Sequence, residues 1–199
     1  MNSPVFGMRP GAHVGLAGTL ALPPRRAFAP TAGERLVLAD GRSVQLRPVQ
    51  PGDVAAEQAF VTALSPASRR RRFHGAMKQL PASVLQAMTS IDFRRHVALV
   101  AEAGCADGAA RLVADARYVR DEHGGAEFAL AVADDWQGLG LGRALLQRLG
   151  RHARLSGVRT LNGSVLADNA PMLALMRSLG AQLRDDPSDA TLVQVAVAL

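Results

Sequence analysis

The sequence predicts an α/β (α+β) fold, a mixed and mostly antiparallel sheet of about six to seven strands flanked by about four to five helices. Three observations predict it. Helical segments follow a first strand, three consecutive strands come next, and the second half of the chain alternates helix with strand. The consecutive strands are joined by the segments GCADG and EHGG, and connections that short require antiparallel neighbours.

The first part of the domain predicts a hairpin followed by helices. Residues 36–49 alternate apolar and polar side chains around an Asp40-Gly41 turn, the pattern of a hairpin or of a turn into a first strand. Asp53 is a candidate helix cap, and Ser65 precedes a proline in the manner of a cap before a first helical turn. Helices are therefore expected over 51–64, 65–75 and 80–90.

The second part predicts the three-stranded meander and the alternating elements. Leu141, Leu145 and Leu149 repeat every fourth residue, as does Ala153, which indicates a helix with one buried face. Strands are expected over 96–104, 110–122, 126–135, 160–167 and 191–199. A further helix is expected over 168–180, with Asp168 or Asn169 as its cap.

Length and composition indicate one domain. The chain has 199 residues, 48% of them apolar and 20% charged, as in ordinary soluble proteins. Residues 1–33 are punctuated by proline and glycine and are expected to form a flexible tail, so that 34–199 form the single domain. The lone Cys105 excludes an internal disulfide and favours a cytoplasmic location. No segment has the roughly 18 apolar residues that a membrane span needs.

The basic charge of the chain raises the question of partners. Lys78 is the only lysine among 23 basic residues, a bias that a GC-rich coding sequence explains. Arg69 to Arg72 stand in a row without aromatic residues for base stacking, so we expect them to be solvated or structural and expect no nucleic-acid partner. The histidines show no spacing typical of a metal site, and we expect no metal. A homodimer is left open.

Residues 134–145, DDWQGLGLGRAL, place three glycines at alternate positions between a strand and a helix. A Rossmann fingerprint fails because Leu145 stands where its third glycine is required. A Walker loop fails because Arg143 and Ala144 replace its lysine and its hydroxyl residue. What remains is the pattern Q-x-x-G-x-G, carried by Gln137, Gly140 and Gly142.

The segment QGLGLG, residues 137–142, resembles the acyl-CoA signature of the GCN5-related N-acetyltransferases, the GNAT superfamily. The resemblance extends over about residues 44–199, whose expected order of elements is also similar. The segments LRPVQPGD, LSPASRRRRF, AEFALAVADDWQGLGLG and DNAPMLALMRSLG look like the acetyltransferase domain of bacterial Pat-type protein lysine acetyltransferases, without the large acyl-CoA-synthetase-like region that often accompanies it. The resemblance implies an N-acetyltransferase with acetyl-CoA as co-substrate and an amine, in the Pat type a protein lysine, as acceptor.

The resemblance also implies which residues bind acetyl-CoA: Val132, Ala133, Asp134, Gln137, Gly138, Leu139, Gly140, Leu141, Gly142, Arg143 and Asn169. Elementary chemistry supports this site, because successive N–H groups at a helix N-terminus can surround a diphosphate. A β-carbon at Gly140 or Gly142 is expected to occupy the space of the phosphates. The alternatives are a plain strand-to-helix turn and, for Arg143, a solvated side chain.

The strand over 126–133 has faces of different size. Alternation places Phe128, Leu130 and Val132 on one face, and Glu127 with three alanines on the other. The bulky face suits a core, whereas the small face leaves room for a thin pantetheine arm where neighbouring strands separate. A backbone N–H near Val132 is then the natural donor to the thioester oxygen.

Glu127 is the candidate general base. An amine is mostly protonated at neutral pH, and it must lose a proton before it attacks a thioester. The resemblance points to the same residue, because Pat-type domains carry a catalytic glutamate in the matching AEF segment. The alternative is a solvated charge at the start of a strand, and Glu102 is the second candidate base.

Other functional residues are less defined. The superfamily implies that Asn169 contacts the cofactor, although asparagine is also a good helix cap. Met176 occupies the position at which many members carry a tyrosine as general acid, and Tyr118 lies in an earlier strand, so no general acid is assigned and water is left to protonate the thiolate. Cys105 has no activating neighbour, which favours direct transfer. The alternatives for the whole chain are a small-molecule amine acetyltransferase and a non-catalytic sensor of coenzyme A.

Overall fold

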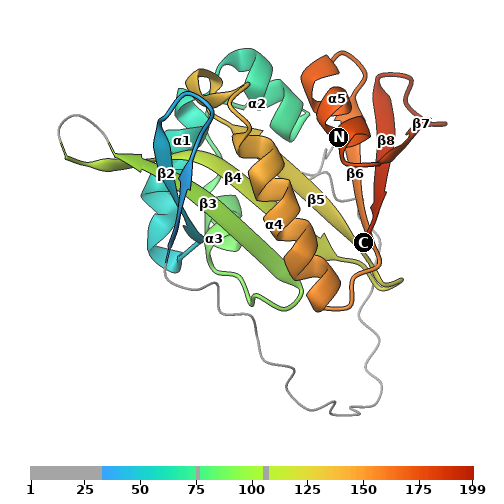
Figure 1. Cartoon of the computed structure of the whole chain (residues 1–199), viewed down its shortest axis with the longest axis horizontal. Helices are drawn as coiled ribbons and strands as arrows, with labels where there is room; N and C mark the ends of the chain where they lie inside the picture. The colour runs from blue at the N-terminus through green and yellow to red at the C-terminus, as the bar shows by residue number, and fades with distance from the viewer. Residues whose placement is uncertain (1–32, 75–76, 105–107) are drawn as a thin grey trace, which may run out of the picture.

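The computed structural model describes residues 33–74, 77–104 and 108–199 (Figure 1). The tail expected over 1–33 lies almost wholly outside the described residues, as does Cys105. Within these ranges the helices are α1 (Val54–Ala63), α2 (Pro66–Phe73), α3 (Ala82–Thr89), α4 (Leu141–Leu155) and α5 (Ala170–Ser178). The strands are β1 (Glu34–Val37), β2 (Ser43–Pro48), β3 (His96–Gly104), β4 (Ala110–Arg120), β5 (Gly125–Val132), β6 (Thr160–Leu166), β7 (Gln182–Asp185) and β8 (Leu192–Ala198).

The strands form one sheet of eight in the order β1-β2-β3-β4-β5-β6-β8-β7. Every neighbouring pair is antiparallel except β5 and β6, which are parallel, so the predicted mixed and mostly antiparallel sheet is confirmed. The strand count is slightly higher than predicted because β7 adds an edge to β8. This strand has only four residues, three of them exposed, and so it carries no apolar alternation that the sequence could show.

The parallel pair β5 and β6 is joined only near its start. Three residue pairs connect the strands, Gly125 with Thr160, Ala126 with Leu161 and Glu127 with Asn162. On its other edge β5 stays paired with β4 as far as Val132. At Gly163 of β6 a β-carbon would lie 2.8 Å from the ring of Phe128, so glycine lets this ring pass close to the β6 backbone. Beyond this point the carboxyl-terminal halves of the two strands have no pairing with each other.

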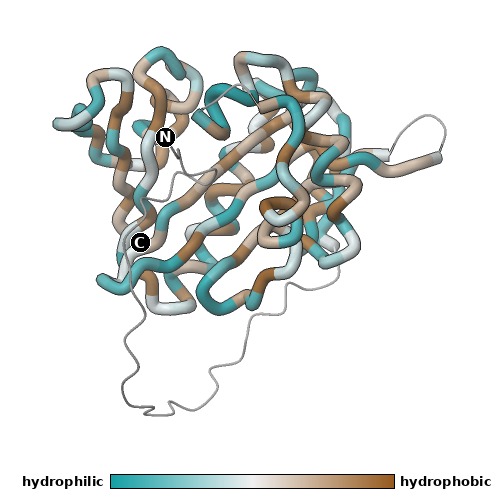
Figure 2. The backbone as a smooth tube through the Cα atoms, turned by 180° about the vertical axis from the view of Figure 1, so that it is seen from behind, coloured by the Kyte–Doolittle hydropathy of each residue, from teal (hydrophilic) through white to brown (hydrophobic). Residues whose placement is uncertain are grey.

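Helices cover both faces of the sheet. On β4, Arg117 contacts Glu57 of α1 at 3.3 Å, whereas the adjacent Tyr118 contacts His152 of α4 at 2.8 Å. Successive strand residues point to opposite faces, so α1 and α4 lie on opposite sides of the sheet (Figure 1). Hydrophobic and polar residues alternate along the central strands seen from behind (Figure 2). The helix α4 buries the residues whose spacing predicted it, Leu141, Leu145, Leu149 and Ala153.

Helix starts were predicted with mixed success. Ser65 accepts a hydrogen bond from the N–H three residues later at 3.2 Å, and Asn169 does the same at 3.4 Å, which confirms both caps. Asp53 occupies the cap position of α1, as expected, but its side chain makes no hydrogen bond to that helix. The carboxylate instead accepts bonds from Arg47 and from the N–H of Gln50, both at 2.7 Å. No helix in the described ranges is both long and apolar enough to cross a membrane.

Candidate active site

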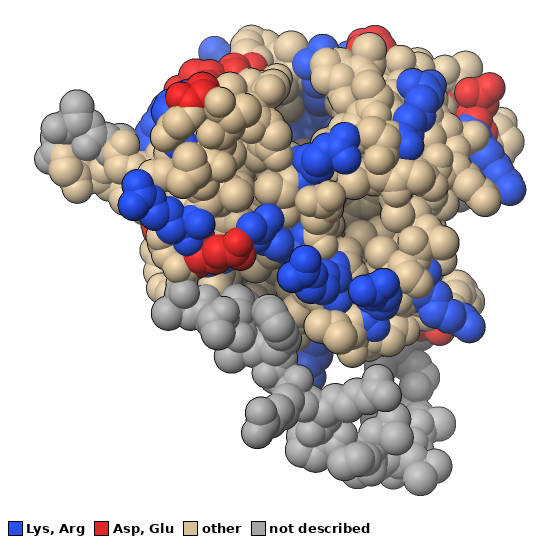
Figure 3. Space-filling model, in the orientation of Figure 1, with Lys and Arg blue, Asp and Glu red and all other residues tan. Residues whose placement is uncertain are grey.

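A cleft of about 470 Å³ opens where β5 and β6 separate. Its walls come from these two strands, from the loop between β5 and α4, from α2 and from α5. The space-filling view shows a hollow in the upper part of the molecule with basic side chains at its edge (Figure 3). Arg71, Arg72 and Arg143 line the cleft and supply positive charge to it.

Most of the predicted site residues meet in this cleft. Its lining includes Glu127, Val132, Gln137, Gly138, Gly140, Leu141, Gly142, Arg143 and Asn169. Ala133, Asp134 and Leu139 do not line it. The N–H of Ala133 donates to Val113 of β4 at 2.8 Å, Asp134 binds the start of α2, and Leu139 packs on the core. Their role as cofactor contacts stays a prediction, while their described contacts hold the loop in place.

The glycine loop presents unpaired backbone to the cleft. Gly138 and Gly140 have φ of 75° and 86°, which favours glycine, and a β-carbon on either would meet no atom within 4 Å. The N–H of Ala144 donates to the carbonyl of Gly140 at 3.0 Å, so the three preceding N–H groups of α4 have no helical acceptor. Free N–H groups at a helix N-terminus next to open space fit the diphosphate of coenzyme A.

The expectation for Gly142 needs correction. A β-carbon at this position would lie 3.2 Å from Leu130 Cδ2 and 3.6 Å from Leu175 Cδ2, so it would meet side chains rather than open space. The first turn of α4 passes close to β5 and α5 here. Gly142 therefore serves the packing of the helix start, and Gly140 is the glycine whose missing side chain leaves space open.

The end of β5 turns backbone groups toward the cleft. Because the N–H of Ala133 points to β4, alternation directs the N–H and carbonyl of Val132 to the opposite edge, where β6 has separated. The Gln137 side chain confirms this direction, since its Nε2 donates to the Val132 carbonyl at 3.0 Å and contacts Ser68 Oγ at 3.2 Å. Gln137 thus fastens the loop to β5 and α2.

Glu127 is half-buried in the cleft wall. Burial raises the pKa of its carboxyl to about 7, and the positive charge of Arg72 opposes part of that shift. Glu127 is thus partly buried rather than fully solvated, and its role as the base stays a prediction. A carboxyl group with a pKa near neutrality can accept a proton and release it again at the pH at which most enzymes work.

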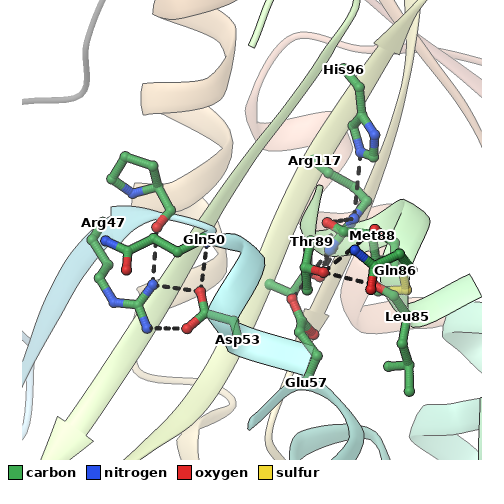
Figure 4. A network of polar contacts seen from close by, with 12 residues as sticks. Arg47, Gln50, Asp53, Glu57, Leu85, Gln86, Met88, Thr89, His96 and Arg117 are labelled. Carbon is green, nitrogen blue, oxygen red and sulfur yellow. Dashed lines mark hydrogen bonds and ion pairs between the residues drawn. The ribbon is translucent and has the colours of Figure 1, made fainter. Parts of the chain in front are cut away.

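A buried ion cluster surrounds Arg117 (Figure 4). It lies on the same face of the sheet as Glu127, because Arg117 is paired with Ala129, two residues along β5. Arg117 donates to Asp115 at 3.0 Å, to Glu57 at 3.3 Å and to the carbonyl of Met88 at 3.0 Å. Burial, reinforced by the charge of Asp115, raises the pKa of Glu57 well above its usual range. Burial alone would also raise the pKa of Asp115, but Arg117 outweighs it and keeps that pKa low. Burial and Asp115 therefore favour the protonated form of Glu57 beside the ion pair of Arg117 and Asp115.

The consecutive arginines of α2 have different surroundings. Arg69 is buried and donates to the carbonyl of Thr62 at 3.1 Å, and the exposed Arg70 pairs with Asp168 at 2.7 Å. For these two residues the predicted structural or solvated role is confirmed. Arg72 is only 9% exposed and lines the cleft, and its Nη2 has no hydrogen-bond partner among the described residues. Arg72 was not among the site residues expected from the sequence.

The remaining candidates lie outside the cleft. Glu102 pairs with Arg47 at 2.6 Å, which removes it as a base for this cavity. Met176 is buried in the core, and Tyr118 is bonded to His152 instead of lining the cleft. Within the part of the chain that the structure describes, no three histidine, cysteine or carboxylate side chains gather as a metal site.

Comparison with known proteins gives the family of the chain. Residues 61–181 match the acetyltransferase (GNAT) family. The chain is 38% identical over 176 residues to Acetyltransferase PA5475 of Pseudomonas aeruginosa, a match that covers 87% of this chain and 94% of that protein. It is 36% identical over 143 residues to Acetyltransferase Pat of Mycolicibacterium smegmatis, covering 71% of this chain but 42% of that protein.

A solved structure agrees with the sequence matches. The GNAT domain of S. lividans PAT superposes with a TM-score of 0.75 at 27% identity, covering 84% of this chain and 97% of that one. The chain belongs to the GNAT acetyltransferase family, whose members transfer an acyl group from acyl-CoA to an acceptor. The resemblance inferred from the QGLGLG loop is confirmed at the level of family and fold.

Proposed function

We propose that this protein transfers the acetyl group of acetyl-CoA to a primary amine, with a protein lysine as the leading acceptor. The placement of Glu127 carries the proposal. Its carboxyl group lies in the cleft that also contains the glycine loop, and burial brings its pKa to about 7. A base of that strength can deprotonate an ammonium group in the cavity that holds the donor.

Donor binding would use the loop and the separated strands. The N–H groups of residues 138–143 would hold the diphosphate, with Arg143 and Asn169 beside them in the lining. The pantetheine arm would run along β5, whose backbone faces the gap left by β6. No metal takes part in the proposal.

The transfer step uses one side chain, Glu127, and one backbone N–H group. Acetyl-CoA supplies the acetyl group as a thioester. Glu127 takes a proton from the acceptor ammonium, directly or through a water, and the free amine attacks the thioester carbon as the C–S bond breaks. A backbone N–H of β5 between Glu127 and Val132, on the edge from which β6 has separated, donates to the carbonyl oxygen while negative charge develops on it. The departing thiolate takes its proton from water, because no side chain of the cleft is assigned to that step.

The lysine acceptor rests on similarity to the Pat proteins, and the general chemistry does not depend on it. A small-molecule amine would need the same base and the same donor site. We infer a cytoplasmic enzyme, because acetyl-CoA is the donor and the chain has a single cysteine.

Calorimetric titration with acetyl-CoA, followed by an acetyl-transfer assay, tests the proposal. Two sets of acceptors are used. The first is a mixture of lysine-containing peptides from a denatured cell lysate, in which acetylated lysines are detected by mass spectrometry, and the second is a panel of small amines. Binding together with transfer to peptide lysines supports the full proposal, and transfer only to small amines replaces the acceptor. Binding without transfer to any amine would indicate a sensor module, and a folded protein that binds no acyl-CoA would overturn the proposal altogether.

A further inference from the structure

Arg72 has an unusual position for an arginine. It lines the cleft, is 9% exposed and stacks its guanidinium 4.8 Å from the ring centre of Phe73. Its Nη2 is buried without a hydrogen-bond partner among the described residues. A guanidinium stays protonated at physiological pH, and leaving a buried charged donor unpaired is costly. Arg72 therefore brings to the cleft wall a positive charge that no carboxylate of the described residues pairs with.

The neighbouring carboxyl groups do not supply that acceptor. Asp115 is held by Arg117 at 3.0 Å, and Glu57 contacts the same arginine at 3.3 Å through Oε1, while its buried Oε2 forms no hydrogen bond with Arg72 or with any other described residue. Glu127 shares the cleft with Arg72 and influences it through space, but no hydrogen bond or ion pair joins the two side chains. Arg72 thus contributes positive charge to the end of the cleft at which Glu127 lies.

Arg71 of α2 also lines the cleft. Burial and the charge of Arg72 lower the pKa of the nearby His74, so this side chain adds little positive charge at neutral pH. An acceptor with a second cationic group near its amine would be repelled there, which disfavours polyamines. The glycine loop begins five residues beyond Val132, and the strand from Glu127 to Val132 spans about 17 Å at a rise of roughly 3.3 Å per residue. A diphosphate on the loop is therefore remote from the base.

We propose that Arg72 is a binding residue for a carboxylate that lies next to the transferred acyl group. The carboxylate belongs either to the acceptor, beside its amine, or to the far end of a dicarboxylic acyl chain on the donor. A planar carboxylate matches the planar guanidinium of Arg72 and would neutralise its unpaired charge. This inference rests on the proposed function and narrows its substrate class.

Two paired comparisons distinguish the sources of the carboxylate. For the donor, succinyl-CoA is compared with acetyl-CoA by calorimetry. For the acceptor, the peptide Ala-Lys-Asp is compared with Ala-Lys-Asn, and an amino acid with its amide, by kcat/KM with acetyl-CoA. We expect the carboxylate member of one pair to be preferred by about tenfold or more, the factor of one charge-assisted hydrogen bond in a buried site.

Variants then assign the preference to Arg72. Arg72→Gln should abolish the preference for the carboxylate. Arg72→Lys should keep only part of that preference, because lysine retains the positive charge but not the two parallel N–H donors of the guanidinium. Arg70→Gln removes an exposed charge outside the cleft and should leave the preference unchanged. Thermal unfolding checks that each variant is folded.

The outcomes separate this inference from the proposed function. A parent protein that transfers acetyl groups without preferring a carboxylate in any pair overturns the inference alone, as does a preference that survives in a folded Arg72→Gln protein. If Arg72→Gln does not fold, the test uses Arg72→Lys instead. A weaker preference for the carboxylate in Arg72→Lys than in the parent supports the inference, and an unchanged preference overturns it. A parent that binds neither acyl-CoA overturns the proposed function as well.

Discussion

The carboxylate of Asp134, in the loop before α4, accepts hydrogen bonds from both the N–H and the hydroxyl of Ser65, the cap of α2, at 2.9 and 2.7 Å. The hydroxyl of Ser68 adds a third at 2.8 Å. Partial burial alone would raise the pKa of Asp134, but these bonds outweigh it and hold the pKa below its usual value. One carboxylate therefore joins the glycine loop to the helix that carries Arg72.

Asp134→Ala should loosen this attachment. We expect the free energy of unfolding to fall by about 1 kcal/mol, a modest value because the residue is exposed, and acetyl-CoA to bind several-fold more weakly. Because the pKa is lowered in the folded state, the stabilisation should be present above the usual pKa of 3.8 and be lost as the pH falls. Denaturant unfolding at several pH values and calorimetry measure both effects.

Asp135→Ala is the matched control for that change. Asp135 is the next residue, is equally exposed, and pairs with Arg111 at 2.5 Å rather than with α2. The Asp135→Ala variant should bind acetyl-CoA with nearly the affinity of the parent protein. An equal loss of affinity in the two variants would show that charge in the loop matters and the link to Ser65 does not.

Gly140→Glu should abolish acetyl-CoA binding, because it places bulk and negative charge where the β-carbon of residue 140 faces open space. Gly157→Glu is its control, since Gly157 also has a positive φ, 84° against 86°, and open space at its β-carbon, but lies beyond the cleft. Both substitutions impose similar backbone strain of about 1 kcal/mol. Calorimetry should show binding only in the control, and binding in both would remove the glycine loop as the phosphate site.

Glu127→Gln should reduce kcat/KM at neutral pH by about a hundredfold or more, the usual contribution of a general base. Because burial raises the pKa of Glu127 to about 7, the basic form is lost below that pH, so the parent rate should rise with pH through about 7. The variant should lack this rise and show only the titration of the acceptor. Rate profiles from pH 5.5 to about 9 with a fixed acceptor test it.

Glu122→Gln controls for the loss of a carboxylate from the same region. Glu122 lies in the exposed turn before β5 and does not line the cleft. The kcat/KM of the Glu122→Gln variant and its dependence on pH should match those of the parent protein. A similar decrease in both variants, or a Glu127→Gln profile that still rises through about pH 7, would assign the base to another group.

The sequence predicted the sheet, the helices and most of the cleft because these depend on local patterns. Alternation and the leucine spacing located the strands and α4, and the glycine loop located a large part of the cleft lining. What local patterns could not show is which residues meet across the fold. Gly142 and the side chain of Asp53 were misjudged for that reason, since Gly142 packs against Leu130 and the Asp53 carboxylate binds Arg47.

Arg72 was missed because a run of arginines hides helical periodicity. Ser65, Ser68 and Arg72 follow one another at spacings of three and four residues, so they share one face of α2. That face meets the loop through Asp134 and the cleft through Arg72. The spacing was available in the sequence, but only the packing of α2 against β5 separates the buried arginines from the exposed ones.

The cluster around Arg117 makes two opposite predictions for stability. Arg117→Ala should cost about 3–5 kcal/mol of unfolding free energy, because it leaves the buried carboxylate of Asp115 unpaired. Glu57→Gln should be neutral or stabilising at pH 7, since the folded protein already holds Glu57 protonated. The folded state binds this proton more tightly than the unfolded chain, whose pKa is about 4.5, so stability should fall as pH rises above that value. Glu57→Gln should remove that decline, which urea unfolding at pH 5 and 8 would measure, and a variant with the same decline as the parent would show that Glu57 is ionised in the folded protein.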